Sequence, residues 1–94
     1  MHATVRSYSA GSEFVDALVE HEGDIRAVIT QLAGFRAYYL IRTPGGDAVT
    51  ISVFDDESAA EESTRAAAAW VAENLGDMSV APPQVTTGKV VLNF

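Results

Sequence analysis

The segment from Gly34 to Asp56 constrains the fold more than any other part of the chain. It contains two apolar stretches of strand length, residues 35–42 and 49–54, which are rich in the aromatic and β-branched side chains that favour strands. Between them lies Thr43-Pro44-Gly45-Gly46-Asp47, a run of residues typical of tight turns. The segment therefore predicts a β-hairpin.

The number of residues in the hairpin loop decides which side chains share a face, because a shift of one residue inverts every pairing. An odd loop groups six apolar residues on one face: Phe35, Tyr39, Ile41, Val49, Ile51 and Val53. We prefer the odd loop, since a covering layer of helices needs a uniformly apolar face. The sequence leaves the register open, and with it the question of which tyrosine, Tyr38 or Tyr39, faces the helices.

A helix is predicted before the hairpin. Apolar residues recur at spacings of three and four from Phe14 to Leu32, the pattern of one helical face. Ser12 is placed to cap the start of this helix and Gly34 to close its end. Gly23 marks the position at which a kink is expected, because glycine has a low helix propensity.

A second helix is predicted after the hairpin, with one further strand at each end of the chain. Ser58 and Glu61 match a capping box that opens the helix, and Gly76 ends it. Residues 2–9 alternate in polarity as a strand does, and residues 84–94 are predicted to form the last strand. The order β-α-β-β-α-β predicts a ferredoxin-like α+β fold, with a four-stranded antiparallel sheet and two helices on one face.

The face of the sheet without helices is expected to be covered by a second copy of the chain. Arg6, Tyr8, Tyr38 and Phe54 are expected on that face, which makes it too apolar for a stable monomer. Arg6 would then be buried and would need an acid, a backbone carbonyl or a bound anion. We favour an ion pair across a homodimer. Whether the last strand, with its apolar end, exchanges between subunits stays open.

Composition narrows the classes of partner. Thirteen acidic and six scattered basic residues give a net charge of −7, which argues against nucleic acid and anionic membranes. The lack of cysteine excludes disulfides, thiolate zinc sites and a cysteine nucleophile. No signal peptide is recognisable, and no apolar run approaches the roughly 20 residues of a membrane span, so a cytoplasmic location is expected.

Two stretches resemble the antibiotic-biosynthesis-monooxygenase-like (ABM-like) family of the dimeric α/β-barrel superfamily. They are the helix-to-strand step Ala33-Gly34-Phe35 with Tyr38-Tyr39-Leu40-Ile41-Arg42, and the strand-to-helix junction from Val53 to Ala60. The resemblance covers the layout of roughly residues 2–93, so residues 1–94 are expected to form one dimeric α/β-barrel domain. It implies a homodimer whose two sheets close a barrel, with a ligand cleft between helices and sheet. Some members oxidise aromatic polyketide-like substrates without metal or flavin, and others degrade haem.

The candidate pocket consists of His21, Tyr39 and Trp70. His21 interrupts an apolar helical face, where it is either a base aimed into the cleft or a histidine at the edge of the core, satisfied by a carbonyl or water. Trp70 lies beside four alanines, which leave either room for a ligand or a closely packed helix. No His or carboxylate spacing points to a metal, and no cofactor is predicted.

Two functions stay open at this level. One is a cofactor-independent monooxygenase acting on a small apolar or aromatic substrate in the helix–sheet cleft, as the resemblance implies. The other is a non-catalytic dimeric module that binds a small molecule or serves as an accessory protein. No complete catalytic set is recognisable in the sequence, so residues alone do not choose between them.

Overall fold

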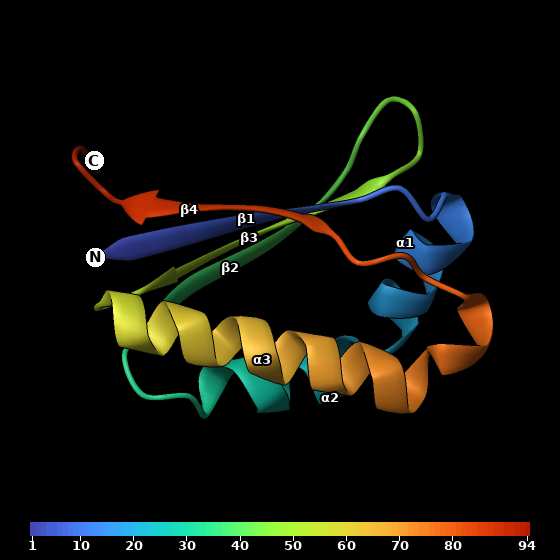
Figure 1. Ribbon diagram of the computed structural model, residues 1–94, viewed down its shortest axis with the longest axis horizontal. Coiled ribbons are helices and arrows are strands. Elements are labelled where there is room, and N and C mark those ends of the chain that lie inside the picture. Colours follow the sequence, from blue (N-terminus) through green and yellow to red (C-terminus); the bar gives the residue numbers. More distant parts are fainter.

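The computed structural model describes all 94 residues as a twisted sheet with its helices on one side (Figure 1). The elements are β1 (His2–Tyr8), α1 (Ser12–Glu20), α2 (Glu22–Thr30), β2 (Phe35–Arg42), β3 (Ala48–Phe54), α3 (Glu57–Asn74), the 3-10 turn η1 (Gly76–Met78) and β4 (Gln84–Lys89). All neighbouring strands are antiparallel, in the order β2-β3-β1-β4. This order confirms the predicted ferredoxin-like fold.

The first predicted helix is divided into α1 and α2. The break lies at His21 (φ −96°, ψ 23°), two residues before the glycine at which a kink was expected. The division lets α1 pack on β3 while α2 turns to lie along α3. A single straight helix would not reach both neighbours.

The predicted caps of two helices are displaced by one or two residues. Asp56, not Ser58, caps α3, because its carboxylate accepts a hydrogen bond from the Ala59 amide at 2.8 Å. A carboxylate also interacts favourably with the positive end of the helix dipole, which a serine hydroxyl does less well. Gly11, not Ser12, takes the capping position of α1.

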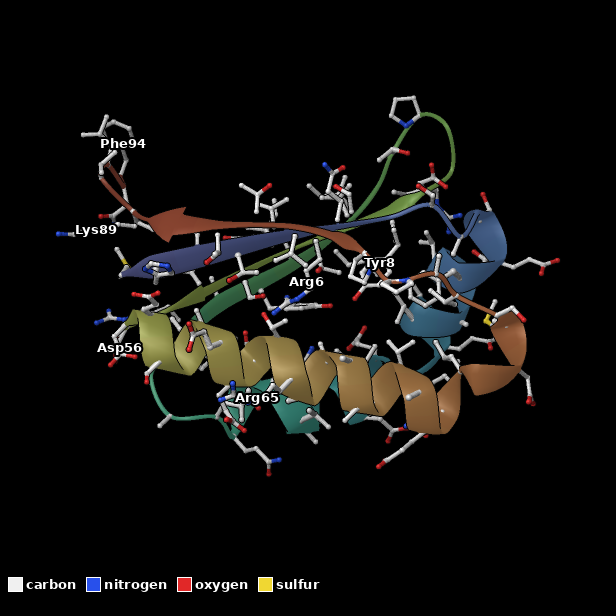
Figure 2. All side chains as sticks on the ribbon, viewed as in Figure 1. Arg6, Tyr8, Asp56, Arg65, Lys89 and Phe94 are labelled. Atoms are coloured by element: carbon white, nitrogen blue, oxygen red, sulfur yellow. The ribbon has the colours of Figure 1, made fainter.

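The last strand is shorter than predicted. β4 ends at Lys89, and the only further ladder-like contact is the Val90 amide donating to the Met1 carbonyl at 3.0 Å. Val91, Leu92 and Phe94 are exposed, and Phe94 projects beyond the end of the sheet (Figure 2). The exchange of this end between subunits stays a prediction.

The hairpin has the odd loop. Arg42 pairs with Ala48, Ile41 with Val49 and Tyr39 with Ile51, which leaves the five residues 43–47 in the turn. The Thr43 amide donates to the Asp47 carbonyl at 2.9 Å and closes it. Phe35 is the exception to the predicted grouping. An irregularity between Phe35 and Ala37 places Phe35 opposite Phe54, where the two rings meet edge to face at 5.8 Å.

The assignment of the two faces was wrong, although the register was right. The helices cover the face with the more polar residues, where Thr4, Arg6, Thr50 and Ser52 are buried. The opposite face has no helices; it is apolar over β2 and β3 and carries Ser7 and Thr86 toward β4. We call it the free face; its apolar members are Val5, Tyr39, Ile41, Val49, Ile51 and Val53.

The four residues expected at a dimer interface therefore lie on the helix side. Arg6, Tyr8 and Phe54 are buried there, and Tyr38 faces α1 and α2. The physical reason is that the helices bring their own apolar residues, such as Phe14 and Trp70, to the layer between helices and sheet. The sheet beneath them can thus carry polar groups that bond with one another, and the ion pair expected across a dimer at Arg6 is excluded.

Candidate functional site

The layer between helices and sheet contains a small central cavity with a larger hollow on either side. The central cavity has a volume of about 30 Å³, roughly the space of one water molecule. One hollow, of about 470 Å³, opens between α1, α2 and β2, and the other, of about 450 Å³, lies between α3, β1 and the connection to β4. We call the latter the β4-side hollow. Both hollows fall in the volume range of small-molecule sites, about 300–1,000 Å³.

Arg6 is the central polar residue of this layer. It extends from β1 toward α3 and is 1% exposed (Figure 2). Its Nη1 donates to Ser52 Oγ at 2.8 Å, and its Nη2 donates to Ser63 Oγ at 3.0 Å and to Thr64 Oγ1 at 2.8 Å. Each of the five ion pairs of the chain involves other residues, so the guanidinium has no acidic partner.

Two of the hydroxyls that bond Arg6 are oriented as acceptors by α3 itself. Ser63 Oγ and Thr64 Oγ1 both donate back to the Ala60 carbonyl, at 2.6 and 3.3 Å. Serine and threonine readily make such bonds to the preceding turn of a helix. Their own hydrogens are thereby used, which leaves lone pairs directed to the guanidinium.

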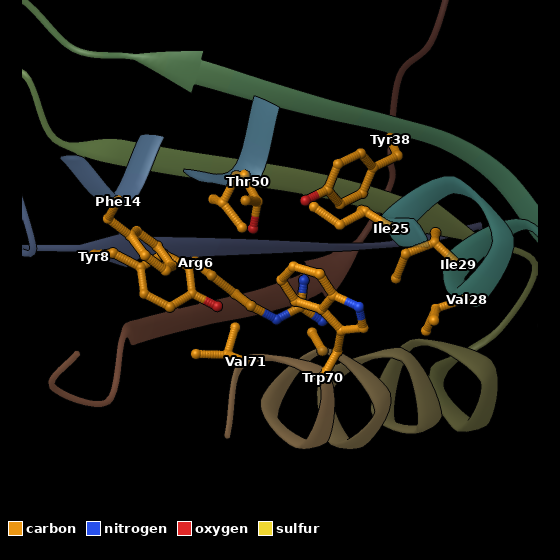
Figure 3. Close-up of a pocket in the computed structure, with 12 residues that line it drawn as sticks. Arg6, Tyr8, Phe14, Ile25, Val28, Ile29, Tyr38, Thr50, Trp70 and Val71 are labelled. Carbon is orange, nitrogen blue, oxygen red and sulfur yellow. The ribbon is translucent and has the colours of Figure 1, made fainter. Parts of the chain in front are cut away.

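Two buried polar atoms on the sheet have no hydrogen-bond partner: Nε of Arg6 and Oγ1 of Thr50. The two residues lie directly opposite one another on β1 and β3, and both line the central cavity (Figure 3). Directly opposed residues have Cβ atoms about 5 Å apart. A buried polar atom without a hydrogen-bond partner destabilises the fold. The two unpaired atoms therefore identify this cavity as the polar centre of the layer.

The two neighbouring tyrosines stay neutral over the physiological pH range. Burial raises the pKa of Tyr38 to about 12, and burial also raises the pKa of Tyr8, against the attraction of the Arg6 charge. Burial likewise lowers the pKa of Arg6, which nevertheless remains protonated at neutral pH. The tyrosines therefore do not neutralise the guanidinium.

The structure brings together two of the three predicted pocket residues. Trp70 is 9% exposed and lines the central cavity, and its ring meets that of His21 edge to face at 5.4 Å. His21 lines none of the three spaces; its Nδ1 lies 3.3 Å from Asp24 Oδ2 at the surface. Tyr39 is 59% exposed on the free face, so Tyr38 occupies the place expected for it.

Sequence reasoning missed Arg6 and Thr50 as lining residues, although a signal was present. Thr4, Arg6, Thr50 and Ser52 stand at alternating positions of two strands that pair, so they form one polar group on one face. We expected that face to contact a second copy of the chain, because the other face of the sheet was more apolar and so better suited to the helices. Polar side chains that are buried need hydrogen-bond partners, and in this layer Arg6 bonds to Ser52 and to hydroxyls of α3.

No group of three His, Asp or Glu side chains lies close enough together to hold a metal ion. None of the helices combines the length and apolar character needed to cross a bilayer.

Comparisons with known proteins give matches among solved structures. No protein-family model matches the sequence, and no curated protein matches it. The haem degrader MhuD of Mycobacterium tuberculosis, solved with two haems in its active site, matches at 14% identity over 100% of this chain and 99% of its own, with a TM-score of 0.74.

Two further structures extend the match. A monooxygenase of Streptomyces coelicolor, ActVA-Orf6, solved with the ligand nanaomycin D, matches at 20% identity over 98% of this chain and 91% of its own, with a TM-score of 0.66. A Deinococcus radiodurans protein grouped with the antibiotic biosynthesis monooxygenases matches at 18% identity over 100% and 96%, with a TM-score of 0.70. The chain thus shares, over its full length, the ferredoxin-like α+β fold of these structures.

Proposed function

We propose that the chain is a cofactor-independent monooxygenase that acts on a small aromatic substrate held between its helices and its sheet. The observation that carries the proposal is the β4-side hollow, about 450 Å³ in volume, walled by small and apolar residues of α3 and of the connection to β4. It adjoins the central cavity, with which it shares Arg6, Tyr8 and Val71. The named activities of structures with this fold support the reaction type by analogy.

The proposed reaction is the oxidation of a phenol to a quinone. One atom of dioxygen enters the ring carbon opposite the hydroxyl, and the other leaves as water with two hydrogens from the substrate. The substrate supplies all the electrons, so the protein needs only to bind the ring, exclude water and keep dioxygen close. Ala68, Val71 and Leu75 provide the apolar surroundings for this in the β4-side hollow.

Oxygen uptake with a panel of phenolic aromatics tests the proposal, with ¹⁸O₂ labelling to establish that one oxygen atom reaches the product. Ala68 lines the hollow and its neighbour Ala69 does not. Ala68→Phe should therefore fill the space and abolish turnover, whereas Ala69→Phe adds the same ring elsewhere on α3 and should leave turnover intact. Equal activity in both variants would overturn the placement of the site.

A second candidate function is non-catalytic binding of the same class of molecule. It is favoured by the lack of a base in the layer: the pKa values of Tyr8 and Tyr38 are raised, and His21 lies outside the lining. Saturable binding of the phenols without oxygen uptake would decide for this function.

We further propose that the chain works as a homodimer that joins through the free face. Six apolar residues lie on this face, and two of them, Tyr39 and Ile41, are 59% and 44% exposed. A continuous apolar patch of this kind is typical of an interface. Sedimentation equilibrium should give the mass of two chains at micromolar concentration, and the mass of one chain would refute the proposal.

A further inference from the structure

We propose that Arg6 binds a single anionic oxygen, so that the ligand of the β4-side hollow is an aromatic molecule with an acidic hydroxyl, bound as its phenolate. The inference rests on the proposed function for the location and the phenolic class of the ligand, and it adds the residue that binds the ligand oxygen and the charge state in which that oxygen is bound. It stands on three features of Arg6: its uncompensated charge, its unused N–H groups and its position between two spaces.

The charge of Arg6 has no counterion within the chain. The residue is 1% exposed, and its three bonded partners are neutral hydroxyls. Removing a charge from water without an opposite charge is expensive, and proteins that do so usually supply a partner. Thirteen acidic residues are present in the chain, yet none pairs with Arg6. An anionic ligand would supply the missing charge.

The N–H groups that remain on Arg6 suit one oxygen rather than two. A guanidinium binds a carboxylate through two parallel N–H groups, either from its two Nη atoms or from Nε and Nη2. Both hydrogens of Nη2 are used, one by Ser63 and one by Thr64, so neither parallel pair is free. Nε has no partner and offers one hydrogen bond. This arrangement favours a phenolate or enolate oxygen over a carboxylate or phosphate.

Thr50 supplies a second donor for the same oxygen. Its Oγ1 is buried without a partner, and the residue pairs with Arg6 across β1 and β3. Both residues line the central cavity, whose volume of about 30 Å³ suits one oxygen atom and excludes a ring. The ring would occupy the β4-side hollow, which Arg6 also lines, beside Ala68, Val71 and Ala72.

The test uses two probes of similar shape, 4-nitrophenol and its neutral methyl ether 4-nitroanisole. Three proteins are compared: the unaltered chain, Arg6→Met, and Arg42→Met as a control. Arg42 is half-exposed and paired with Asp16 at 2.7 Å, so its substitution changes the net charge equally but leaves the layer between helices and sheet untouched. Affinities are measured through the fluorescence of Trp70, the only tryptophan of the chain.

We expect Arg6→Met to weaken binding of the ionised phenol by about tenfold to a hundredfold, because a hydrogen bond between charged groups contributes about 1.5–3 kcal/mol. Nitroanisole should bind the three proteins equally, and Arg42→Met should behave as the unaltered chain. Equal phenol binding by Arg6→Met and the unaltered chain would overturn the role of Arg6 while leaving the proposed function in place. If neither probe binds any of the proteins, the proposed function fails as well.

A measurement on the unaltered chain keeps the proposal falsifiable if Arg6→Met does not fold. Ionised 4-nitrophenol absorbs visible light, so its titration can be followed while it is bound. A cation and a hydroxyl donor at its oxygen should make the bound phenol ionise at a lower pH than the free one. Ionisation at the same or a higher pH would overturn the proposal, because an apolar site without a useful cation shifts it upward.

Discussion

The two faces of the sheet differ in polarity, and the difference is the reverse of that expected for a small monomeric protein. The face under the helices buries Thr4, Arg6, Thr50 and Ser52, and the face without helices carries only apolar residues at its centre. A sheet normally turns its apolar face to its helices and its polar face to water. Here the helices, with Tyr8, Ala48 and Phe54 of the sheet, provide the apolar part of the layer, and the sheet also provides its buried polar residues.

Each face of the sheet is suited to a different kind of partner. A polar group enclosed by apolar walls, with an unpaired cation in it, is suited to a small ligand. A bare apolar face is suited to a large apolar partner, and a second copy of the same face is the simplest one. We expect each face to respond to substitution in its own way, and the predictions that follow test this.

The largest effect is expected from truncating a side chain on the helix side. Phe54 is fully buried and contacts Phe35, so Phe54→Ala should lower the free energy of unfolding by about 3–5 kcal/mol. Val53, its neighbour on the free face, is the matched position. At low protein concentration, Val53→Ala should lower the free energy of unfolding by clearly less than Phe54→Ala does. The loss caused by Val53→Ala should grow as the protein concentration rises. Urea unfolding at two protein concentrations measures both effects. A similar loss of unfolding free energy for the two variants would contradict the proposed difference between the faces.

The next effect concerns self-association through the free face. Ile51→Asp places a charge at the centre of this face, which should weaken association by more than about a hundredfold, since an unpaired charge in an apolar contact is strongly unfavourable. Val19→Asp makes the same kind of change on α1, where the side chain is exposed, and should leave association unchanged. Sedimentation equilibrium of the two variants gives the answer; dissociation by Val19→Asp alone would move the interface to the helices.

A smaller effect is expected from removing one acceptor of Arg6. Ser63→Ala leaves a guanidinium N–H unpaired in a buried layer, which should cost about 2 kcal/mol of unfolding free energy. Ser58→Ala removes an exposed hydroxyl from the first turn of the same helix, which Asp56 caps, and should change stability by less than about 0.5 kcal/mol. Thermal unfolding compares them. An equal, small effect would mean that the hydroxyls do not support the charge.

The smallest effect is a loss of stability at high pH. The pKa of Tyr38 is about 12 in the folded chain, against an ordinary value of 10.0, so the folded state holds this proton more tightly than the unfolded state. The resulting stability is complete below pH 10 and is lost as the pH rises toward 12, by about 1–2 kcal/mol after allowance for the partial exposure of the ring. Urea unfolding from pH 9 to 12 should show this fall, and Tyr38→Phe should make it shallower. A profile unchanged by Tyr38→Phe would place the tyrosine in water.

The sequence predicted the fold because its signals are local. The turn at Pro44-Gly45-Gly46, the alternation of the two hairpin strands and the apolar period after Phe14 each depend on neighbouring residues alone. The order of the elements and the rules for their connection then leave few topologies. The register followed as well, because only the odd loop collects Tyr39, Ile41, Val49 and Ile51 on one face.

The site was less predictable because it depends on which face the helices cover. Both faces of the hairpin carry aromatic residues, so the difference between Tyr38 and Tyr39 is decided by packing distant in sequence. We expected the helices to cover the more apolar face, because a monomer buries its most apolar surface in its own core. Arg6 and Thr50, on two different strands, become neighbours only once β1 lies beside β3.

The most direct test of the division between the faces is an isotope-filtered NOE experiment on a mixture of labelled and unlabelled chains, which detects contacts between copies only. We predict contacts from the methyl groups of Val5, Ile51 and Val53 to the Tyr39 ring of another copy. We predict no such contacts from Val71 or Ile25, which line the cavity on the helix side. Contacts between copies at Val71 or Ile25, with none at Ile51, would contradict the division between the faces.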